Sequence, residues 1–197
     1  VKSSAASDVY KRQVDNDGIC YRTYPGTHPE KGAFFTRGTS HDEYARYTED
    51  GEVNAATLSR LMKKFRTASE LVPEPVIEIN GEDSCGVIFY GSTSPAVHEA
   101  KDILKEKEIN IDLMQIRSFP FNLDVWEFIA SHDRIYVVEQ NRDSQMRTLI
   151  MAEGGISPEI LRPLVHFTGD PIQASYIVNK ISEREVNYKS HINAKKR

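Results

Sequence analysis

Cysteine is scarce in this sequence, which has two cysteines in 197 residues, Cys20 and Cys85. They lie far apart and neither belongs to a C-x-x-C pair, which excludes a self-contained iron–sulfur cluster or zinc ribbon. Cys85 opens an apolar run and is predicted to be a small buried residue, whereas Cys20 is a candidate for an exposed thiol. We expect no disulfide between them, and reduced cysteines favour a cytoplasmic location.

Long apolar runs and an excess of basic residues are also missing. No stretch approaches the roughly 18 apolar residues that span a bilayer, and residues 1–13 lack the apolar centre of a secretory signal. The net charge of −4 and the pI of about 5.9 argue against a nucleic-acid binder, which usually presents a basic face. These absences predict a protein that binds neither membranes nor nucleic acid.

The first quarter of the chain has no clear hydrophobic periodicity. Residues 1–13 resemble translated adapter sequence, so we predict that they are non-native and disordered and that the natural polypeptide extends upstream of Val14. Residues 14–50 are polar and irregular, and so long an irregular stretch is usually functional or a connector. A helix is then predicted over residues 52–71, ended by Pro73. Its apolar stripe, at helical spacing, consists of Leu58, Leu61, Met62 and Phe65.

From Val76 onward, short apolar runs alternate with segments whose apolar residues recur at helical spacing. The runs 76–80 and 86–90 are separated by turn residues, which predicts a hairpin. The further predicted elements are helix 94–107, strand 110–116, helix 122–131, strand 135–138, helix 144–153, strand 164–167 and helix 171–183. Inward positions are predicted at Val97, Ala100, Ile103 and Leu104, at Leu123, Trp126 and Ile129, and at Ala174, Ile177, Val178 and Ile181. Residues 186–197 are predicted to be a polar tail.

This alternation predicts the fold class. Strands separated by helices imply right-handed βαβ crossovers, hence an α/β fold with a mainly parallel sheet and helices on both faces. The nearly all-apolar strand cores agree with a sheet that is covered on both sides. An irregular connector and one helix precede this domain.

A nucleotide-binding loop is expected in many such folds, but neither G-x-G-x-x-G nor G-x-x-x-x-G-K-[ST] occurs. Gly91, Ser92 and Thr93 lie where a strand meets its helix and can present donors to an anion at the helix N-terminus. The simpler interpretation is that Ser92, Thr93 or Ser94 caps the helix.

Three polar residues, Glu139, Gln140 and Asn141, directly follow the apolar run 135–138. The carboxyl ends of strands in open α/β sheets carry ligand and partner contacts. The trio is therefore a candidate partner surface or active-site edge. Alternatively, Asn141 and Asp143 only cap the helix that follows.

The segment 37–44 concentrates acids, bases and anion binders. His41 beside Asp42 and Glu43 has the chemistry for proton transfer, but adjacency in sequence does not bring side chains together. The interpretations left open are substrate contact, an interdomain or subunit contact, and a solvated loop. The candidate residues are Arg37, His41, Asp42, Glu43 and Tyr44. The six histidines show no metal-ligand spacing, so no metal site and no catalytic residue are assigned.

Four segments in this order resemble a known family. They are Tyr24 to Ala33 (YPGTHPEKGA), Thr36 to Tyr44 (TRGTSHDEY), Tyr90 to Thr93 (YGST) and Val137 to Met146 (VVEQNRDSQM). Together they are similar to the alpha subunit of 2-oxoacid:ferredoxin oxidoreductases, of which the 2-oxoglutarate type is the most similar. The resemblance runs from about Val14 to Glu183.

The resemblance implies a domain organisation and a reaction. Residues 76–185 would be a transketolase C-terminal-like domain, and residues 14–75 the end of a pyrimidine-side domain with its connector helix. Such enzymes convert a 2-oxoacid, coenzyme A and oxidised ferredoxin into an acyl-CoA, CO2 and reduced ferredoxin. They use thiamine pyrophosphate, Mg²⁺ and Fe–S clusters.

The sequence lacks the family's cofactor motifs, so those ligands are expected outside this chain. It has no Y-P-I-T-P-type segment, no G-D-G…N element and no cluster cysteines. The resemblance therefore implies a C-terminal fragment of an alpha subunit, inactive alone, that assembles with a thiamine-binding beta subunit in a hetero-oligomer and passes electrons to ferredoxin. The sequence does not identify the 2-oxoacid.

Two other functions stay open. One is the C-terminal domain of a transketolase or of a 2-oxoacid dehydrogenase E1 beta-like enzyme. The other, from a different class, is a stand-alone α/β module that binds a small anion at Gly91, Ser92 and Thr93 or has a regulatory role.

Overall fold

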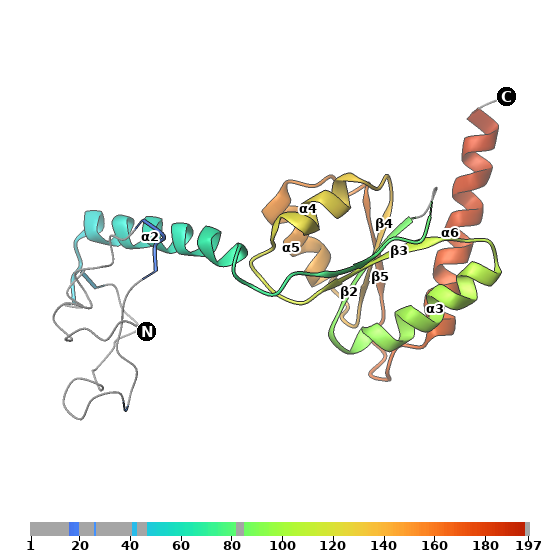
Figure 1. The fold of residues 1–197 in the computed structure, drawn as a ribbon, viewed down its shortest axis with the longest axis horizontal. Helices are drawn as coiled ribbons and strands as arrows, with labels where there is room; N and C mark the ends of the chain where they lie inside the picture. The colour runs from blue at the N-terminus through green and yellow to red at the C-terminus, as the bar shows by residue number, and fades with distance from the viewer. Residues whose placement is uncertain (1–15, 20–25, 27–40, 43–46, 82–84, 196–197) are drawn as a thin grey trace. The chain divides into compact units, whose positions relative to one another are not determined.

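Residues 16–19, 26, 41–42, 47–81 and 85–195 are described by a computed structural model. The chain divides into two units, Val1–Val72 and Pro73–Arg197. Figure 1 shows the helix of the first unit and the sheet of the second. No described helix is long and apolar enough to cross a membrane.

The first unit contains helix α2, Gly51–Ser69, which begins where Asp50 accepts hydrogen bonds from the N–H groups of Glu52 and Val53. Residues 16–19 lie against one side of this helix. There Arg60 Nη1 donates to the Gly18 carbonyl at 3.0 Å, and the Thr67 hydroxyl donates to the Asp17 carbonyl at 2.6 Å. Gly18 has φ +74°, and an added Cβ would lie 2.6 Å from Lys64 N, so both the conformation and the close approach require glycine.

The apolar stripe of α2 points away from that contact. No residue of α2 is buried among the described residues, and Leu58, Met62 and Phe65 are exposed. The predicted helix is confirmed to within two residues at each end. Its amphipathic pattern does not correspond to burial within the described part of the first unit.

The second unit is built on a five-stranded sheet in the order β1-β3-β2-β4-β5. The strands are β1 (Val76–Glu78), β2 (Cys85–Tyr90), β3 (Ile111–Ile116), β4 (Ile135–Glu139) and β5 (Leu161–Val165). Strands β2 to β5 pair in parallel, and β1 pairs antiparallel with β3. The predicted α/β class with a mainly parallel sheet is confirmed.

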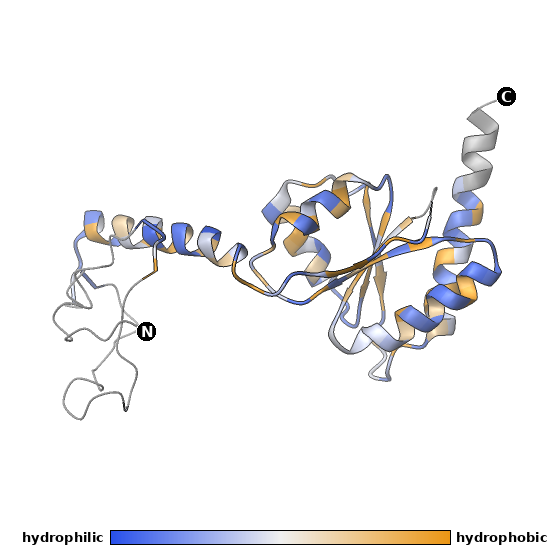
Figure 2. Ribbon diagram, in the orientation of Figure 1, coloured by the Kyte–Doolittle hydropathy of each residue, from blue (hydrophilic) through white to orange (hydrophobic). Residues whose placement is uncertain are grey.

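Helices cover both faces of this sheet, as Figure 1 shows. The turn η2 (Gly91–Thr93) leads into α3 (Ser94–Glu106), which packs with α6 (Ala174–Lys195) on one core that includes Val87 and Tyr136. On the other face, α4 (Leu123–Ala130) and α5 (Gln145–Gly154) form a second core with Ile88 and Val137. Figure 2 shows the hydrophobic strands between these helices, whose outer sides are largely hydrophilic.

The predicted hairpin of the first two strands is wrong. β1 pairs with β3 in the register Ile77 to Met114, and both sides of β2 are taken by β3 and β4. A turn signal between two apolar runs identifies a reversal of the chain but not the neighbour of each strand. The antiparallel strand therefore lies one position further out, at the edge.

Several local predictions also need correction. Leu123 was expected inside but is exposed at the start of α4, where Val125 and Phe128 are buried instead. The fifth strand lies at 161–165 rather than 164–167, and α6 begins after Pro171 and continues through most of the predicted tail. The inward stripe of α6 is confirmed: Ala174, Ile177, Val178 and Ile181 are all buried.

Cys85 is buried at the start of β2, as predicted. Burial, followed by the nearby Glu185 carboxylate, raises the pKa of this thiol to about 12. Because the thiolate is the reactive form, we expect Cys85 in a Cys20→Ser background to react with Ellman's reagent at pH 8 at least about 100-fold more slowly than in guanidinium chloride. Rapid reaction in the native protein would contradict this burial.

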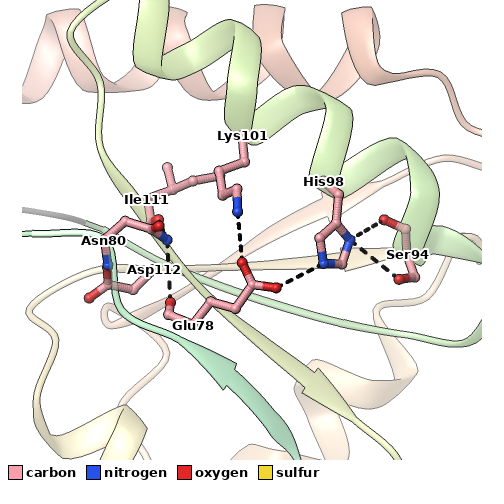
Figure 3. Close-up of polar contacts among 7 residues, drawn as sticks. All are labelled: Glu78, Asn80, Ser94, His98, Lys101, Ile111 and Asp112. Carbon is pink, nitrogen blue, oxygen red and sulfur yellow. Dashed lines mark hydrogen bonds and ion pairs between the residues drawn. The ribbon is translucent and has the colours of Figure 1, made fainter.

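Glu78 ties the edge strand β1 to α3 (Figure 3). Its carboxylate accepts from Lys101 Nζ at 2.7 Å and lies 3.1 Å from His98 Nε2. The hydrogen bond from Lys101 lowers the pKa of Glu78, burial opposes this, and His98 adds to the lowering. The ionised form is therefore the one that the folded state stabilises.

We predict that Glu78→Gln destabilises the second unit only while Glu78 is ionised. With its folded pKa below the ordinary value of about 4.3, the contribution is present above that pH and is lost as the pH falls through the folded pKa. The loss at pH 7 should be below about 1 kcal/mol, because the pair is partly exposed. Urea unfolding followed by the fluorescence of Trp126, the single tryptophan, should show the difference between wild type and variant shrinking below about pH 4. A difference independent of pH would contradict the argument.

Candidate functional site

The carboxyl ends of β2 and β4 bring two predicted site segments together. Gln140 Nε2 donates to the hydroxyl oxygens of Thr93, at 3.2 Å, and Ser92, at 3.4 Å. Asn141 Nδ2 lies 3.4 Å from the hydroxyl of Tyr90. We call this group the sheet-end cluster; it consists of Tyr90, Ser92, Thr93, Glu139, Gln140 and Asn141.

Glu139 anchors the cluster from inside. It is fully buried, and its carboxylate accepts from the N–H groups of Met146, at 2.7 Å, and Arg147, at 3.0 Å. These are N–H groups of the first turn of α5. A negative charge at this end of a helix also interacts favourably with the helix dipole. The N-cap residue Ser144 has a left-handed backbone and makes no side-chain cap hydrogen bond. Glu139, which lies seven and eight residues before these two N–H groups in sequence, therefore takes the place of the cap.

Asn141 completes this arrangement. Its Oδ1 accepts from the N–H groups of Asp143, at 3.1 Å, and Gln145, at 3.2 Å, and its Nδ2 donates to Glu139 at 2.8 Å. The alternative that Asn141 supports the following helix is thus seen in the structure. The polar trio has a structural role, whatever else it does.

Gln140 joins three segments of the chain. Besides its contacts with the turn after β2, its Oε1 accepts from the N–H of Ile172 at 3.3 Å. Its side chain is nonetheless exposed, as are Gly91, Ser92 and Arg142. Arg142 and Asp143 form an ion pair in solvent, which contributes little to stability. The exposed part of the cluster is thus a polar surface held by hydrogen bonds between three chain segments.

The expected hydroxyl cap of α3 is wrong for Thr93. Thr93 is the N-cap residue but makes no side-chain cap hydrogen bond, since its hydroxyl accepts from Gln140. A 3-10 turn over Gly91–Thr93 leads into the helix instead, and Gly91 has φ +58°. Anion binding by Gly91, Ser92 and Thr93 remains a prediction.

The candidates around residue 41 lie in the first unit. Arg37, Glu43 and Tyr44 are outside the described residues. His41 forms an isolated bridge with Tyr47, and its Nδ1 lies 3.0 Å from the Asp42 carbonyl. Because a carbonyl only accepts, Nδ1 carries the proton in this contact. Proton transfer by His41 and Asp42 remains a prediction.

Two buried charged networks escaped the sequence analysis. Asp112 accepts from the N–H of Asn80 at 2.7 Å and lies 3.2 Å from His132 Nε2. Glu185 accepts from Arg134 Nε at 2.9 Å and from the Tyr136 hydroxyl at 2.8 Å. Both have a sequence signal: Asp112 interrupts an apolar strand, and Glu185 lies four residues after Ile181 in the inward stripe of α6.

Neither network involves a candidate metal centre. Among the residues that the structure describes, no group of three or more His, Cys, Asp or Glu side chains is placed to hold a metal ion. Fold and cluster together define an α/β domain in which parallel strands β2 and β4 end in a hydrogen-bonded polar surface.

Comparison with known proteins identifies relatives that are similar in sequence. No family model matches the sequence. The alpha subunit of 2-oxoacid:ferredoxin oxidoreductase 2 from Aeropyrum pernix is 26% identical over 181 residues, which are 89% of this chain and 27% of the relative. The alpha subunit of 2-oxoacid:ferredoxin oxidoreductase 1 from Sulfurisphaera tokodaii is 28% identical over 82% of this chain and 25% of the relative.

A solved structure has a similar fold. The 2-oxoglutarate:ferredoxin oxidoreductase of Magnetococcus marinus, with 2-oxoglutarate, coenzyme A and succinyl-CoA bound, matches 86% of this chain and 29% of its own with a TM-score of 0.72 at 23% identity. The chain spans about a quarter of the length of the curated relatives. The resemblance to 2-oxoacid:ferredoxin oxidoreductase alpha subunits is confirmed as a similarity of sequence over most of the chain.

Proposed function

We propose that this chain is part of the alpha subunit of a 2-oxoacid:ferredoxin oxidoreductase of the 2-oxoglutarate type. The complete enzyme converts a 2-oxoacid, coenzyme A and two oxidised ferredoxins into an acyl-CoA, CO2 and two reduced ferredoxins. The similarity to two alpha subunits over more than four fifths of the chain supports the assignment. The ligands bound to the Magnetococcus marinus enzyme favour 2-oxoglutarate and coenzyme A as substrates.

The chain contributes structure rather than cofactor ligands. Thiamine pyrophosphate with Mg²⁺ supplies carbanion stabilisation when bound, but the described residues offer no metal-binding group and the sequence lacks the cofactor motifs. We therefore assign the thiamine site to a beta subunit and the Fe–S clusters to residues outside this chain. Two cysteines that form no C-x-x-C pair favour a cytoplasmic enzyme.

The sheet-end cluster carries the proposed role in assembly. Its buried Glu139 and its bridging Gln140 fix three chain segments relative to one another, which leaves Gly91, Ser92, Gln140 and Arg142 exposed on a rigid support. Rigid presentation lowers the ordering cost of binding a partner. Residues 76–185 act as the transketolase C-terminal-like domain, and residues 14–75 as the end of the preceding domain with its connector. The segment from Arg37 to Tyr44 provides a second contact with substrate or subunit.

An activity assay of the isolated chain tests whether the cofactor ligands lie outside it. Purified protein is incubated with 2-oxoglutarate, coenzyme A, thiamine pyrophosphate, Mg²⁺ and methyl viologen, and the reduced dye is followed by absorbance. We expect no reduction above the rate without 2-oxoacid. Reduction that depends on 2-oxoglutarate would contradict the assignment of cofactor ligands to other subunits.

A further inference from the structure

Three arginines gather at the amino ends of β4 and β5, at the opposite end of these strands from the sheet-end cluster. Arg134 directly precedes β4, Arg162 is the second residue of β5, and Arg184 lies on α6. Arg162 pairs with Tyr136 in the sheet. The guanidinium carbons of Arg162 and Arg184 lie 5.8 Å and 5.7 Å from the centre of the Tyr136 ring. Two cations therefore share one aromatic ring.

A second ring, that of Tyr188, belongs to the same group. Tyr188 lies one turn after Arg184 on α6, and the guanidinium carbons of Arg134 and Arg162 lie 4.3 Å and 5.6 Å from the centre of its ring. Tyr188 is partly buried, and its hydroxyl makes no hydrogen bond with the described part of the chain. We call this group the arginine cluster; it consists of Arg134, Tyr136, Arg162, Arg184, Glu185 and Tyr188.

The carboxylate of the arginine cluster, that of Glu185, is already used. It pairs with Arg134 at 2.9 Å and accepts from the Tyr136 hydroxyl at 2.8 Å. Arg162 Nη1 lies 3.3 Å from that hydroxyl, and Arg184 Nη1 donates to a backbone carbonyl at 2.9 Å. Within the described part of the chain, neither Arg162 nor Arg184 forms an ion pair.

The acidic residues next in sequence do not balance these two charges. Asp133 and Glu183 are exposed and form no ion pair with another described residue. Arg162 and Arg184 are both partly buried. Partly buried charges are usually paired, and contacts with aromatic rings offset only part of the cost. Each guanidinium has five N–H donors, most of which are unused here. The arginine cluster therefore has the charge and the donors to bind an anion.

We propose that the arginine cluster binds a phosphate group, held by the guanidinium groups of Arg162 and Arg184 and by a hydrogen bond from the Tyr188 hydroxyl. A phosphate dianion matches two unpaired positive charges, and the planar guanidinium fork matches its oxygens. The phosphate is either the free ion or an ester of a small molecule. The inference rests on the arginine cluster and does not depend on the proposed oxidoreductase function.

Calorimetric titration of the full chain with inorganic phosphate and with phenyl phosphate tests the proposal. The buffer is held at about pH 8, above the second pKa of about 6 of a phosphate ester, and sodium chloride keeps the ionic strength constant. We expect saturable binding at one site per chain. Tighter binding of inorganic phosphate would identify the free ion as the ligand, and tighter binding of phenyl phosphate would identify an ester.

Variants that each remove one positive charge separate a site from general charge attraction. Arg162→Gln and Arg184→Gln should each weaken phosphate binding at least about tenfold, because charge-assisted hydrogen bonds are lost. The matched control is Arg142→Gln, at an exposed position near the other end of β4, which should bind as the wild type does. Circular dichroism checks that each variant is folded.

Tyr188→Phe is the mildest change, because it keeps the ring beside Arg134 and Arg162 and removes only the hydroxyl. It should weaken phosphate binding about fivefold. This variant decides the outcome if an arginine variant does not fold, and unchanged binding would then count against the proposal.

Three results would overturn the proposal. The first is the absence of saturable binding of either probe. The second is an equal loss of affinity in Arg142→Gln and Arg162→Gln, which would indicate general charge attraction. The third is wild-type affinity in folded Arg162→Gln and Arg184→Gln, which would leave these arginines with a structural role alone.

Discussion

Replacement of Glu185 by alanine is expected to destabilise the second unit by about 3 kcal/mol, because it removes one member of a buried ion pair. Glu185 is 2% exposed, and its carboxylate accepts from Arg134 and from the Tyr136 hydroxyl. Burial and this carboxylate both raise the pKa of Tyr136, which therefore stays protonated and donates. The variant leaves that hydroxyl without its acceptor and Arg134 without this ion pair.

The measurement is urea unfolding followed by Trp126 fluorescence, which reports on the second unit. Glu183→Ala, at an exposed position on the same helix, is the control and should change the free energy of unfolding by less than about 0.5 kcal/mol. Combining Glu185→Leu with Arg134→Met should recover much of the loss, because the two charges are then removed together. A loss equal to that of the control would contradict the role of the pair.

Glu139→Ala is expected to cost about 2 to 4 kcal/mol and to loosen the first turn of α5. Two N–H groups, of Met146 and Arg147, lose their acceptor, and Asn141 Nδ2 loses the nearer of its two acceptors. Buried donors left unsatisfied cost about 1–3 kcal/mol each, partly relieved where water can enter. The favourable interaction between the Glu139 carboxylate and the dipole of α5 is also lost.

Hydrogen exchange separates this local effect from general destabilisation. The amides of Met146 and Arg147 should exchange faster in Glu139→Ala under native conditions, whereas those of β3 should change only with global stability. Glu153→Ala, exposed near the other end of α5, should leave both amides protected. Unchanged protection of Met146 and Arg147 in Glu139→Ala would show that Glu139 is not the cap.

Much of the fold was predictable because the hydrophobic residues of the second unit recur with clear strand and helix periodicity. The alternation from β2 to α6 predicts the α/β class, and the stripe of α6 is buried where expected. Strand pairing was harder, since local turn residues do not determine which neighbour β1 meets. Leu123 was misplaced because the helix around it is short, and its buried side is set by Val125 and Phe128.

The sequence pointed to the members of the sheet-end cluster other than Tyr90 as candidates, but it did not predict how they are connected. Glu139, Gln140 and Asn141 were found because polar residues end a buried strand, and Gly91 to Thr93 because a strand meets a helix. That these segments bond to each other follows from the pairing of β2 with β4, which sequence order alone does not give. The capping of α5 by Glu139 depends on the left-handed turn at Ser144, a conformation that the sequence does not signal.

A chimera tests most directly the proposal that this chain is part of an alpha subunit and works only in a complex. The segment of the Aeropyrum pernix alpha subunit that matches this chain is replaced by residues 14–197 and produced with the remaining subunit of that enzyme. The predicted result is co-elution of the subunits and methyl viologen reduction that requires both a 2-oxoacid and coenzyme A. A chimera that is folded by circular dichroism, yet neither co-elutes nor reduces the dye, would contradict the account.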